Sequence, residues 1–319
     1  MSGHPPEGLF DFEAAAKLPT NILFGTSSWN YPGWMGTVYR EHYKDEKDLR
    51  ARSLIEYSQF PWFRTVGIDS SFYGPPALST LTRYASQVPA DFEWCTKVWD
   101  TITIPRFPKI DRYKDRAGQV NATFLDPQAF TSRVAAAFSH DEIRQHTGVF
   151  ILQFPRITFD QDLSPQTFLE RLGAFLGSIP TDFRYAVELR NESLLIPEYF
   201  EVLNAHGVTH CFNHWSQMPP LHVQMTSSAN AGGLSAPFYV ARILTPLGMK
   251  YEDAVRRFQP YEYLQAPIPH MRADLIRLAR RGLEKNVKVY ILVNNRSEGY
   301  APGTIDSVGR ELVRSLEVQ

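Results

Sequence analysis

The sequence predicts a single (β/α)8 barrel, the TIM-barrel fold with eight parallel strands in an α/β arrangement. Eight apolar segments of strand length alternate with segments whose apolar residues mostly recur at helical spacing. The fourth apolar segment is almost continuous, which is typical of parallel strands buried on both faces. The length of 319 residues suits one such barrel. We assign residues 21–319 to the barrel and residues 1–20 to an N-terminal extension.

The expected strands end where polar or turn-forming residues begin. They lie at residues 22–24, 66–68, 92–98, 148–155, 184–190, 208–213, 238–243 and 287–293. The expected helices lie at residues 48–60, 77–87, 126–140, 164–177, 197–206, 271–285 and 304–316. Asp126 is an expected N-cap, because Pro127 follows it at the first helical position.

Two connections fit the regular alternation poorly. Residues 99–125 form a long stretch with prolines and charges of both signs, and connections of that length are usually functional loops or disordered segments. Residues 215–237 are rich in prolines and small residues and predict little regular helix. We therefore expect an irregular helix layer after the sixth strand.

The composition is that of an ordinary globular protein, with 43% hydrophobic and 21% charged residues. The formal net charge of -1 provides no basic field, which disfavours nucleic-acid binding by charge alone. Cys95 and Cys211 lie in apolar strand segments and are expected to be buried, reduced thiols. No apolar run suits a signal peptide or a membrane span, so we expect a cytoplasmic protein without a membrane partner.

The loop after the first strand is unusually aromatic. Trp29, Tyr31 and Trp34 stand within six positions around a Pro-Gly pair, more than a simple chain reversal needs. They could form one wall of a ligand pocket. They could equally form a lid packed over the barrel mouth, and the sequence does not separate the two.

Polar side chains gather at the carboxyl ends of the expected strands, where TIM barrels carry their functional groups. Glu188 and Arg190 are two residues apart on one strand and therefore share a face, which suggests a carboxylate acid or base beside a guanidinium that orients a ligand. A structural ion pair is the alternative. The other candidates at strand ends are Asp69 as a further catalytic residue and, as ligand-binding residues, Ser71, Tyr73, Gln153, His214, Arg242, Asn294 and Asn295.

Lys97 ends the third expected strand and could anchor an anion, act as a Schiff-base amine or pair with Glu188. The sequence shows no apolar cage that would lower its pKa, so we favour the anchor or the pair. Because both residues lie on odd-numbered strands, we expect them to approach each other. A dry pair would make Glu188→Gln cost about 3 kcal/mol. We expect a wet pocket instead, with a cost below about 1 kcal/mol.

A metal site is not expected. His206, His210 and His214 recur every four residues, but Gly207 ends the helix, so two of them follow strand periodicity without a neighbouring acidic ligand. No Walker-type loop, dinucleotide fingerprint or nucleophile elbow is present. We predict no cofactor.

Six segments together resemble the YecE-like family, domain of unknown function 72. They read GTSSWNYPGWMGTVY, VGIDSSFYGPP, FEWCTKV, FILQFP, YAVELR and VNNRSEGYAPGT and occur in this order between residues 25 and 304. The resemblance implies a TIM barrel without an assigned reaction. The cleft positions that match the family pattern are Trp29, Trp34, Lys97, Gln153, Glu188, Arg190, Arg242, Asn294 and Asn295.

The chain departs from the family pattern at three polar positions. Gly67 and Asp69 replace an expected Glu-x-Asn, Thr103 is followed by Ile104 instead of His, and Arg242 precedes Ile243, Leu244 and Thr245 instead of x-His-Gly. An anion or sugar pocket is then expected with altered or absent catalysis.

Two functions fit the sequence. The first is a hydrolase or lyase that acts on a small anionic or polyhydroxylated substrate at the barrel mouth, with Glu188 as acid or base. The second is a nucleotide or single-stranded nucleic-acid binding module whose aromatics stack on bases. The near-neutral net charge favours the first.

Overall fold

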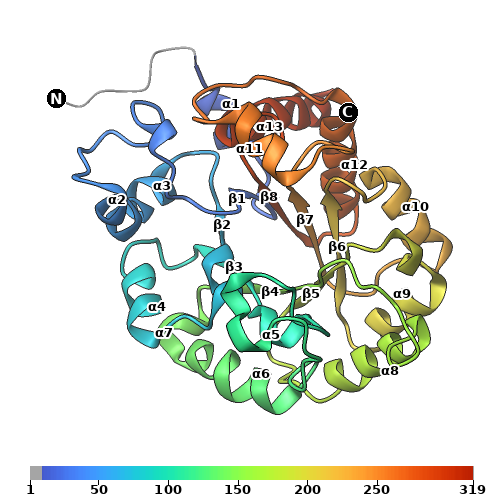
Figure 1. Cartoon of the computed structure of the whole chain (residues 1–319). Helices are drawn as coiled ribbons and strands as arrows, with labels where there is room; N and C mark the ends of the chain where they lie inside the picture. The colour runs from blue at the N-terminus through green and yellow to red at the C-terminus, as the bar shows by residue number, and fades with distance from the viewer. Residues whose placement is uncertain (1–8, 319) are drawn as a thin grey trace.

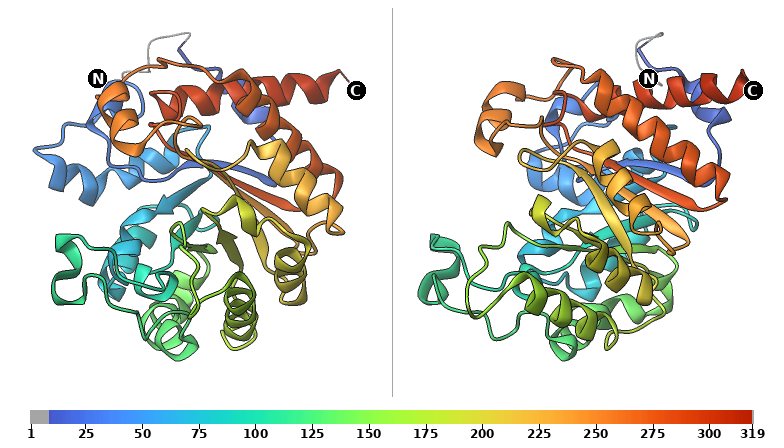
Figure 2. Two further views of the ribbon diagram at one scale, coloured as in Figure 1. Left: turned by 45° about the vertical axis from the view of Figure 1, so that its right-hand side comes forward. Right: turned by 90° about the vertical axis from the view of Figure 1, so that its right-hand side faces the viewer.

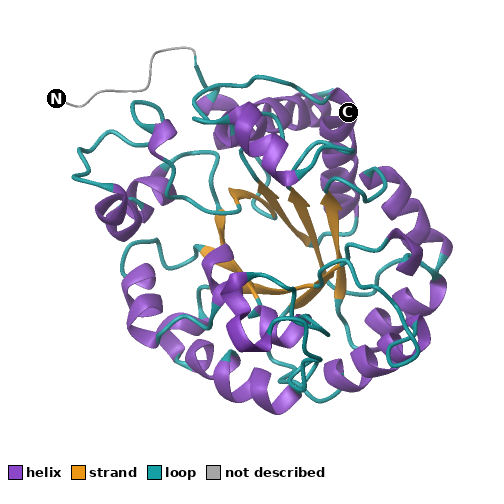
Figure 3. Cartoon of the chain, viewed as in Figure 1, coloured by secondary structure: helices purple, strands orange, loops and turns teal. Residues whose placement is uncertain are grey.

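A closed barrel of eight parallel strands forms the centre of the computed structural model, which describes residues 9–318. Each strand pairs with the next, and β8 closes the ring by pairing with β1, as the circle of strands in Figure 3 shows. The strands are β1 (Ile22–Thr26), β2 (Thr65–Ile68), β3 (Glu93–Lys97), β4 (Thr147–Gln153), β5 (Tyr185–Glu188), β6 (Thr209–His214), β7 (Phe238–Ile243) and β8 (Lys288–Val293). The predicted TIM barrel is confirmed.

Helices surround the barrel and cover the outer face of the sheet (Figures 1 and 2). The α-helices are α1 (Phe12–Lys17), α2 (Glu46–Arg52), α3 (Leu54–Gln59), α4 (Leu78–Ala85), α5 (Asp100–Thr103), α6 (Pro127–Arg133), α7 (Asp141–Arg144), α8 (Pro165–Leu176), α9 (Pro197–Ala205), α10 (Leu221–Asn230), α11 (Tyr251–Phe258), α12 (Pro269–Glu284) and α13 (Ala301–Glu317). Short 3-10 helices are η1 (Pro32–Trp34), η2 (Asp69–Tyr73), η3 (Asp111–Arg116), η4 (Ala135–Ser139) and η5 (Glu192–Leu194).

The strands are buried on both faces, and this divides the apolar side chains into two layers. One layer fills the barrel interior and includes Cys95, Ile151, Ala186, Cys211 and Val240. The larger layer lies between the sheet and the helices. Both cysteines are buried and free, as expected. Strand periodicity therefore decides which side chains point into the barrel interior, and it does so for the polar residues at the carboxyl ends of the strands as well.

The expectation of little regular helix after the sixth strand is wrong. Helix α10 occupies ten residues of that segment. Its buried Gln224 donates to the carbonyls of Asn213 and Pro219 and accepts the amide of Asn213, so the helix docks on β6 through a polar side chain. Apolar periodicity could not reveal such a docking face.

Several other boundaries also differ from the expectations. The helix expected at residues 48–60 is two helices separated at Ser53. The one expected at residues 126–140 ends as an α-helix at Arg133 and continues as η4. The Asp126 cap is confirmed, because its carboxylate accepts the amides of Gln128 and Ala129.

Part of the predicted N-terminal extension packs on the barrel. Residues 1–8 of that extension lie outside the described residues. Helix α1 lies beside α13, where the amide of Asp11 donates to the Asp306 carboxylate (Figure 1). None of the helices between residues 9 and 318 has the length and apolar character needed to cross a membrane.

Candidate functional site

Five charged side chains meet at the carboxyl ends of the barrel strands, and we call them the charged cluster. Lys97 and Glu188 are the last residues of β3 and β5, and Arg242 lies near the end of β7. Asp69 follows β2, and Arg190 follows β5 by two residues. Odd-numbered strands supply three of the five, in agreement with a shared interior layer.

Glu188 is the centre of the cluster and is fully buried. One carboxylate oxygen accepts from Arg190, and the other accepts from Arg242 Nη1 at 2.6 Å. Burial alone would raise the pKa of Glu188, but the charges of Arg190 and Arg242 outweigh it and hold that pKa below its usual value. Glu188 is therefore a permanent carboxylate at neutral pH.

Arg242 connects the two carboxylates of the cluster. Its Nη2 donates to both oxygens of Asp69 at 2.8 and 2.7 Å, while its Nη1 donates to Glu188. The side chain is only 1% exposed, and its Nε has no hydrogen-bond partner among the described residues. Burial lowers the pKa of Arg242, but the charges of Asp69 and Glu188 raise it more, so the guanidinium stays charged.

Lys97 is the exception in the cluster, because no described residue forms an ion pair or a hydrogen bond with its amine. It is 9% exposed, and its Nζ lies 3.8 Å from the ring centroid of Phe72. Burial lowers the pKa of Lys97 to about 8, with Asp69 and Glu188 opposing and Arg242 and Arg190 reinforcing the effect. The contact with Phe72 stabilises the ammonium by about 1 kcal/mol, which offsets only part of the effect of burial.

This arrangement corrects two expectations about Lys97 and Glu188. The carboxylate of Glu188 pairs with Arg190 and Arg242 rather than with Lys97. Its site is also dry, which contradicts the expected wet pocket around Glu188. The side chain of arginine is longer than that of lysine and ends in a fork of N–H donors that matches a carboxylate, so the two arginines bind the carboxylates in preference to Lys97.

The cluster carries an excess of one positive charge when Lys97 is protonated. Two carboxylates, Asp69 and Glu188, face the three cations Lys97, Arg190 and Arg242. An unbalanced charge in a poorly hydrated place is costly. The cluster can relieve this cost by binding an anion or by releasing the proton of Lys97.

The aromatic residues of the first loop lie mostly in the core. Trp34 is fully buried, with its ring 6.4 Å from that of Tyr57, and Trp29 is 4% exposed. This placement matches the packed lid rather than the pocket wall for both tryptophans. Tyr31 is partly buried against Trp34 and Tyr261, and burial raises its pKa to about 12.

The polar candidates near β2 and β4 differ in what they touch. Ser71 is buried, and its hydroxyl donates to the carbonyl of Lys97 at 2.6 Å, which ties η2 to β3. Tyr73 is 68% exposed. Gln153 pairs in register with Glu188 and is partly buried, which brings it to the edge of the cluster.

The remaining candidates support loops near the mouth. His214 is buried, and its Nδ1 donates to the carbonyl of Thr245. Asn294 accepts the amide of Arg296, and Asn295 accepts from the Trp34 indole at 3.2 Å. These contacts make both asparagines organisers of the loop after β8.

Sequence reasoning missed three residues beside the cluster. Phe72 lies under the Lys97 amine, and the Trp215 ring lies 4.5 Å from the Arg190 guanidinium. Arg112 lies 4.5 Å from the Tyr73 ring and pairs with Asp100. The first two adjoin predicted strand ends, a position that could have identified them, whereas nothing in the sequence singles out Arg112 within its long loop.

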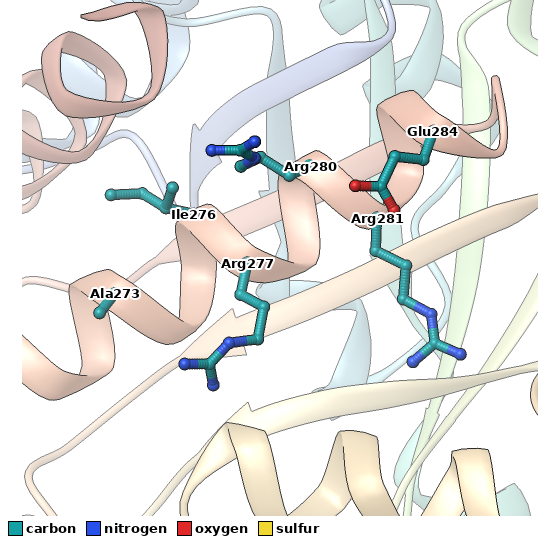
Figure 4. A pocket seen from close by; sticks show the side chains of 6 residues that line it. All are labelled: Ala273, Ile276, Arg277, Arg280, Arg281 and Glu284. Atoms are coloured by element: carbon teal, nitrogen blue, oxygen red, sulfur yellow. The ribbon is translucent and has the colours of Figure 1, made fainter. Parts of the chain in front are cut away.

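A separate surface hollow lies on α12 and has a volume of about 440 Å³. Figure 4 shows the six side chains that line it, all on this one helix: Ala273, Ile276, Arg277, Arg280, Arg281 and Glu284. It shares no residue with the charged cluster. Within residues 9–318, no three His, Cys, Asp or Glu side chains are grouped to hold a metal ion.

The model of the family described as protein of unknown function DUF72 matches residues 23–318. The chain belongs to the DUF72 family. This agrees with the resemblance to the YecE-like family, and the family has no assigned function. No curated protein matches the chain significantly.

Solved structures of DUF72 proteins share the fold. A DUF72 family protein from Thermotoga maritima is 20% identical with a TM-score of 0.59, and the match covers 93% of this chain and 99% of that one. Two structures of a DUF72 family protein from Enterococcus faecalis are 15% identical, cover 93% of this chain, and have TM-scores of 0.58 and 0.62. The matches cover 98% and 96% of those chains.

Proposed function

We propose that this DUF72 protein binds a small anionic or polyhydroxylated molecule at the charged cluster and acts on it as a hydrolase or lyase. The excess positive charge among buried side chains is the observation that carries the proposal. Lys97 and Arg190 are 9% and 7% exposed, and they are the cations with the fewest partners. An anion placed against them neutralises the cluster where the field is least screened.

The surroundings of Glu188 favour a role other than the acid or base expected from the sequence. A carboxylate that is bound by two guanidiniums and has a lowered pKa is a weak base and carries no proton to donate. We assign to Glu188 the task of holding Arg190 and Arg242 in place. Lys97 is then the titratable group of the cluster.

Thermal stability in the presence of anions tests the proposal. Phosphate, pyrophosphate and phosphorylated sugars should raise the melting temperature of the wild type. An anion present at 100 times its Kd adds about 2.7 kcal/mol to the free energy of unfolding. The gain should be strongly reduced in Lys97→Met. The gain should persist in the matched control Lys288→Met, because Lys288 is the first residue of β8 and lies at the end of the barrel opposite to the charged cluster. No gain from any anion, or an equal gain in Lys97→Met, would contradict the proposal.

Exposed tyrosines in the segments that follow β2 and β7 at the same end of the barrel favour a second candidate, nucleotide or single-stranded nucleic-acid binding. Tyr73, Tyr251 and Tyr263 are 68%, 50% and 62% exposed, and such rings can stack on bases. This candidate predicts that single-stranded oligonucleotides bind with an affinity that falls steeply as salt rises. Undetectable or salt-insensitive binding would reject it.

A further inference from the structure

We propose that the amine of Lys97 is a nucleophile that forms an imine with the carbonyl group of a small anionic aldehyde or ketone. The inference rests on the proposed function, because the charged cluster is the site that receives the ligand. It adds the reactive group and the chemical class of the ligand. It also favours lyase chemistry over hydrolysis, since an iminium ion withdraws electrons from neighbouring bonds of the ligand.

The first argument is the shortage of counter-charge around Lys97. Both oxygens of Asp69 accept from Arg242, and the two oxygens of Glu188 are divided between Arg190 and Arg242. In the described chain neither carboxylate forms an ion pair or a hydrogen bond with the ammonium, and the group in contact with it is the ring of Phe72. The sequence lacked evidence for the burial of the Lys97 amine, and the structure supplies it, because the residue is only 9% exposed.

The second argument concerns which group in the cluster can lose its charge. The charged groups that face Lys97 are Asp69, Glu188, Arg190 and Arg242. The guanidinium of Arg112 also lies over the Phe72 ring, 5.9 Å from its centroid. The guanidinium of an arginine does not deprotonate in proteins. The amine of Lys97 is therefore the group that releases a proton, and burial sets its pKa at about 8, with Arg242 and Arg190 assisting. At pH 7 about a tenth of it is then a free, nucleophilic amine, and this fraction rises to about half at pH 8.

The reaction balances with water as the only product besides the imine. Lys97 first releases one proton to solvent, and the neutral amine then forms a C–N bond to the carbonyl carbon while the C=O π electrons move to oxygen. That oxygen takes one proton from the nitrogen and one from solvent and leaves as water. The product is a protonated iminium that keeps the positive charge of the original ammonium. The anionic group of the ligand stays near Arg190.

Reductive trapping in the wild-type protein tests the inference without relying on a variant. The probe is pyridoxal 5′-phosphate, an aldehyde with a phosphate group, applied at low concentration at pH 7.5 with sodium cyanoborohydride. The hydride reduces the iminium to a stable secondary amine, and peptide mass spectrometry identifies the labelled lysine. Lys97 should be labelled at least about 10-fold faster than the exposed Lys47, because a pKa of about 8 gives on the order of 100-fold more free amine at this pH than the ordinary pKa of a lysine side chain.

Two comparisons separate the imine from simple anion binding. Pyridoxine 5′-phosphate has an alcohol in place of the aldehyde, so it should slow the labelling of Lys97 while forming no adduct. Lys97→Arg keeps the charge and should lose the label. If phosphate compounds stabilise the protein but Lys97 is labelled no faster than Lys47, the imine is refuted and the proposed function stands. If they neither stabilise the protein nor label Lys97, both are refuted.

Discussion

Replacing Glu188 by glutamine tests the structural account of the charged cluster directly. The substitution keeps the size of the side chain but removes the negative charge that Arg190 and Arg242 share. The amide also offers one oxygen in place of two, so its NH2 group must face the donors of one guanidinium. The cluster then holds one carboxylate against three cations, nearly all of them buried.

The expected loss of stability follows from the burial of all three partners. Their side chains are 0%, 6% and 1% exposed for Glu188, Arg190 and Arg242, so water cannot replace the lost charge. Removing one partner from a buried ion pair costs about 3–5 kcal/mol. We expect Glu188→Gln to lose that amount, in place of the loss below about 1 kcal/mol expected from the sequence.

The assay is a reversible urea titration with Glu192→Gln as the matched control. Glu192 is exposed and lies four residues further along the chain, and its substitution should change the free energy of unfolding by less than about 0.5 kcal/mol. A loss below about 1 kcal/mol in Glu188→Gln, at an unchanged dependence on urea, would refute the reasoning.

The pH dependence of the stability difference between wild type and Glu188→Gln distinguishes the loss of charge from a packing defect. Because the pKa of Glu188 is lowered in the folded state, its stabilising contribution is complete above the unfolded-state pKa of about 4.3 and disappears as the pH falls through the folded-state value. The difference between wild type and Glu188→Gln should therefore be constant from about pH 5.5 up to the range in which Lys97 titrates, and it should shrink in acid. A difference that stays constant in acid would indicate a packing defect instead.

Three further substitutions test other parts of the structure by urea titration. Relative to Lys97→Met, the wild type should gain stability as the pH rises from about 8 towards 10, by up to about 1.4 kcal/mol per pH unit. The reason is that the lowered pKa of Lys97 leaves the folded state with fewer bound protons than the unfolded state. A stability difference that does not change with pH would contradict this. Ser164→Ala should cost about 1 kcal/mol, because the hydroxyl accepts the amide of Thr167 at the start of α8, and no loss would show that the cap contributes nothing. Gly309→Ala should cost at least about 1–3 kcal/mol, because a Cβ there would lie 2.2 Å from the Trp62 ring, and an unchanged stability would mean that the ring moves freely.

Much of the barrel could be predicted because strand periodicity determines it. The nearly continuous apolar run of β4 indicated burial on both faces, and the two-residue spacing of Glu188 and Arg190 placed them on one face at a strand end. The strand positions alone put Lys97, Glu188 and Arg242 near one another. These inferences need only the local sequence and the topology of the fold.

The pairing within the site could not be predicted, because it depends on side-chain reach and on partners distant in the sequence. Arg242 binds Glu188 from 54 positions away and Asp69 from 173. The Trp34 indole is held by Asn295, 261 positions away, which makes it part of the core. Helix α10 lacked a clear apolar stripe, because its buried Gln224 makes hydrogen bonds in place of apolar contacts.

The two ends of the barrel show why solvent access matters more than the count of charges. At the amino end, Glu93 accepts from Arg184 and Lys288, so that end also carries one excess positive charge. The side chains of those two cations are 38% and 43% exposed, and water stabilises the excess. At the carboxyl end the corresponding excess is enclosed, because Arg190 and Arg242 are 6% and 1% exposed. Water therefore stabilises the imbalance at one end of the barrel, while at the other end a bound anion or the loss of the Lys97 proton would relieve it.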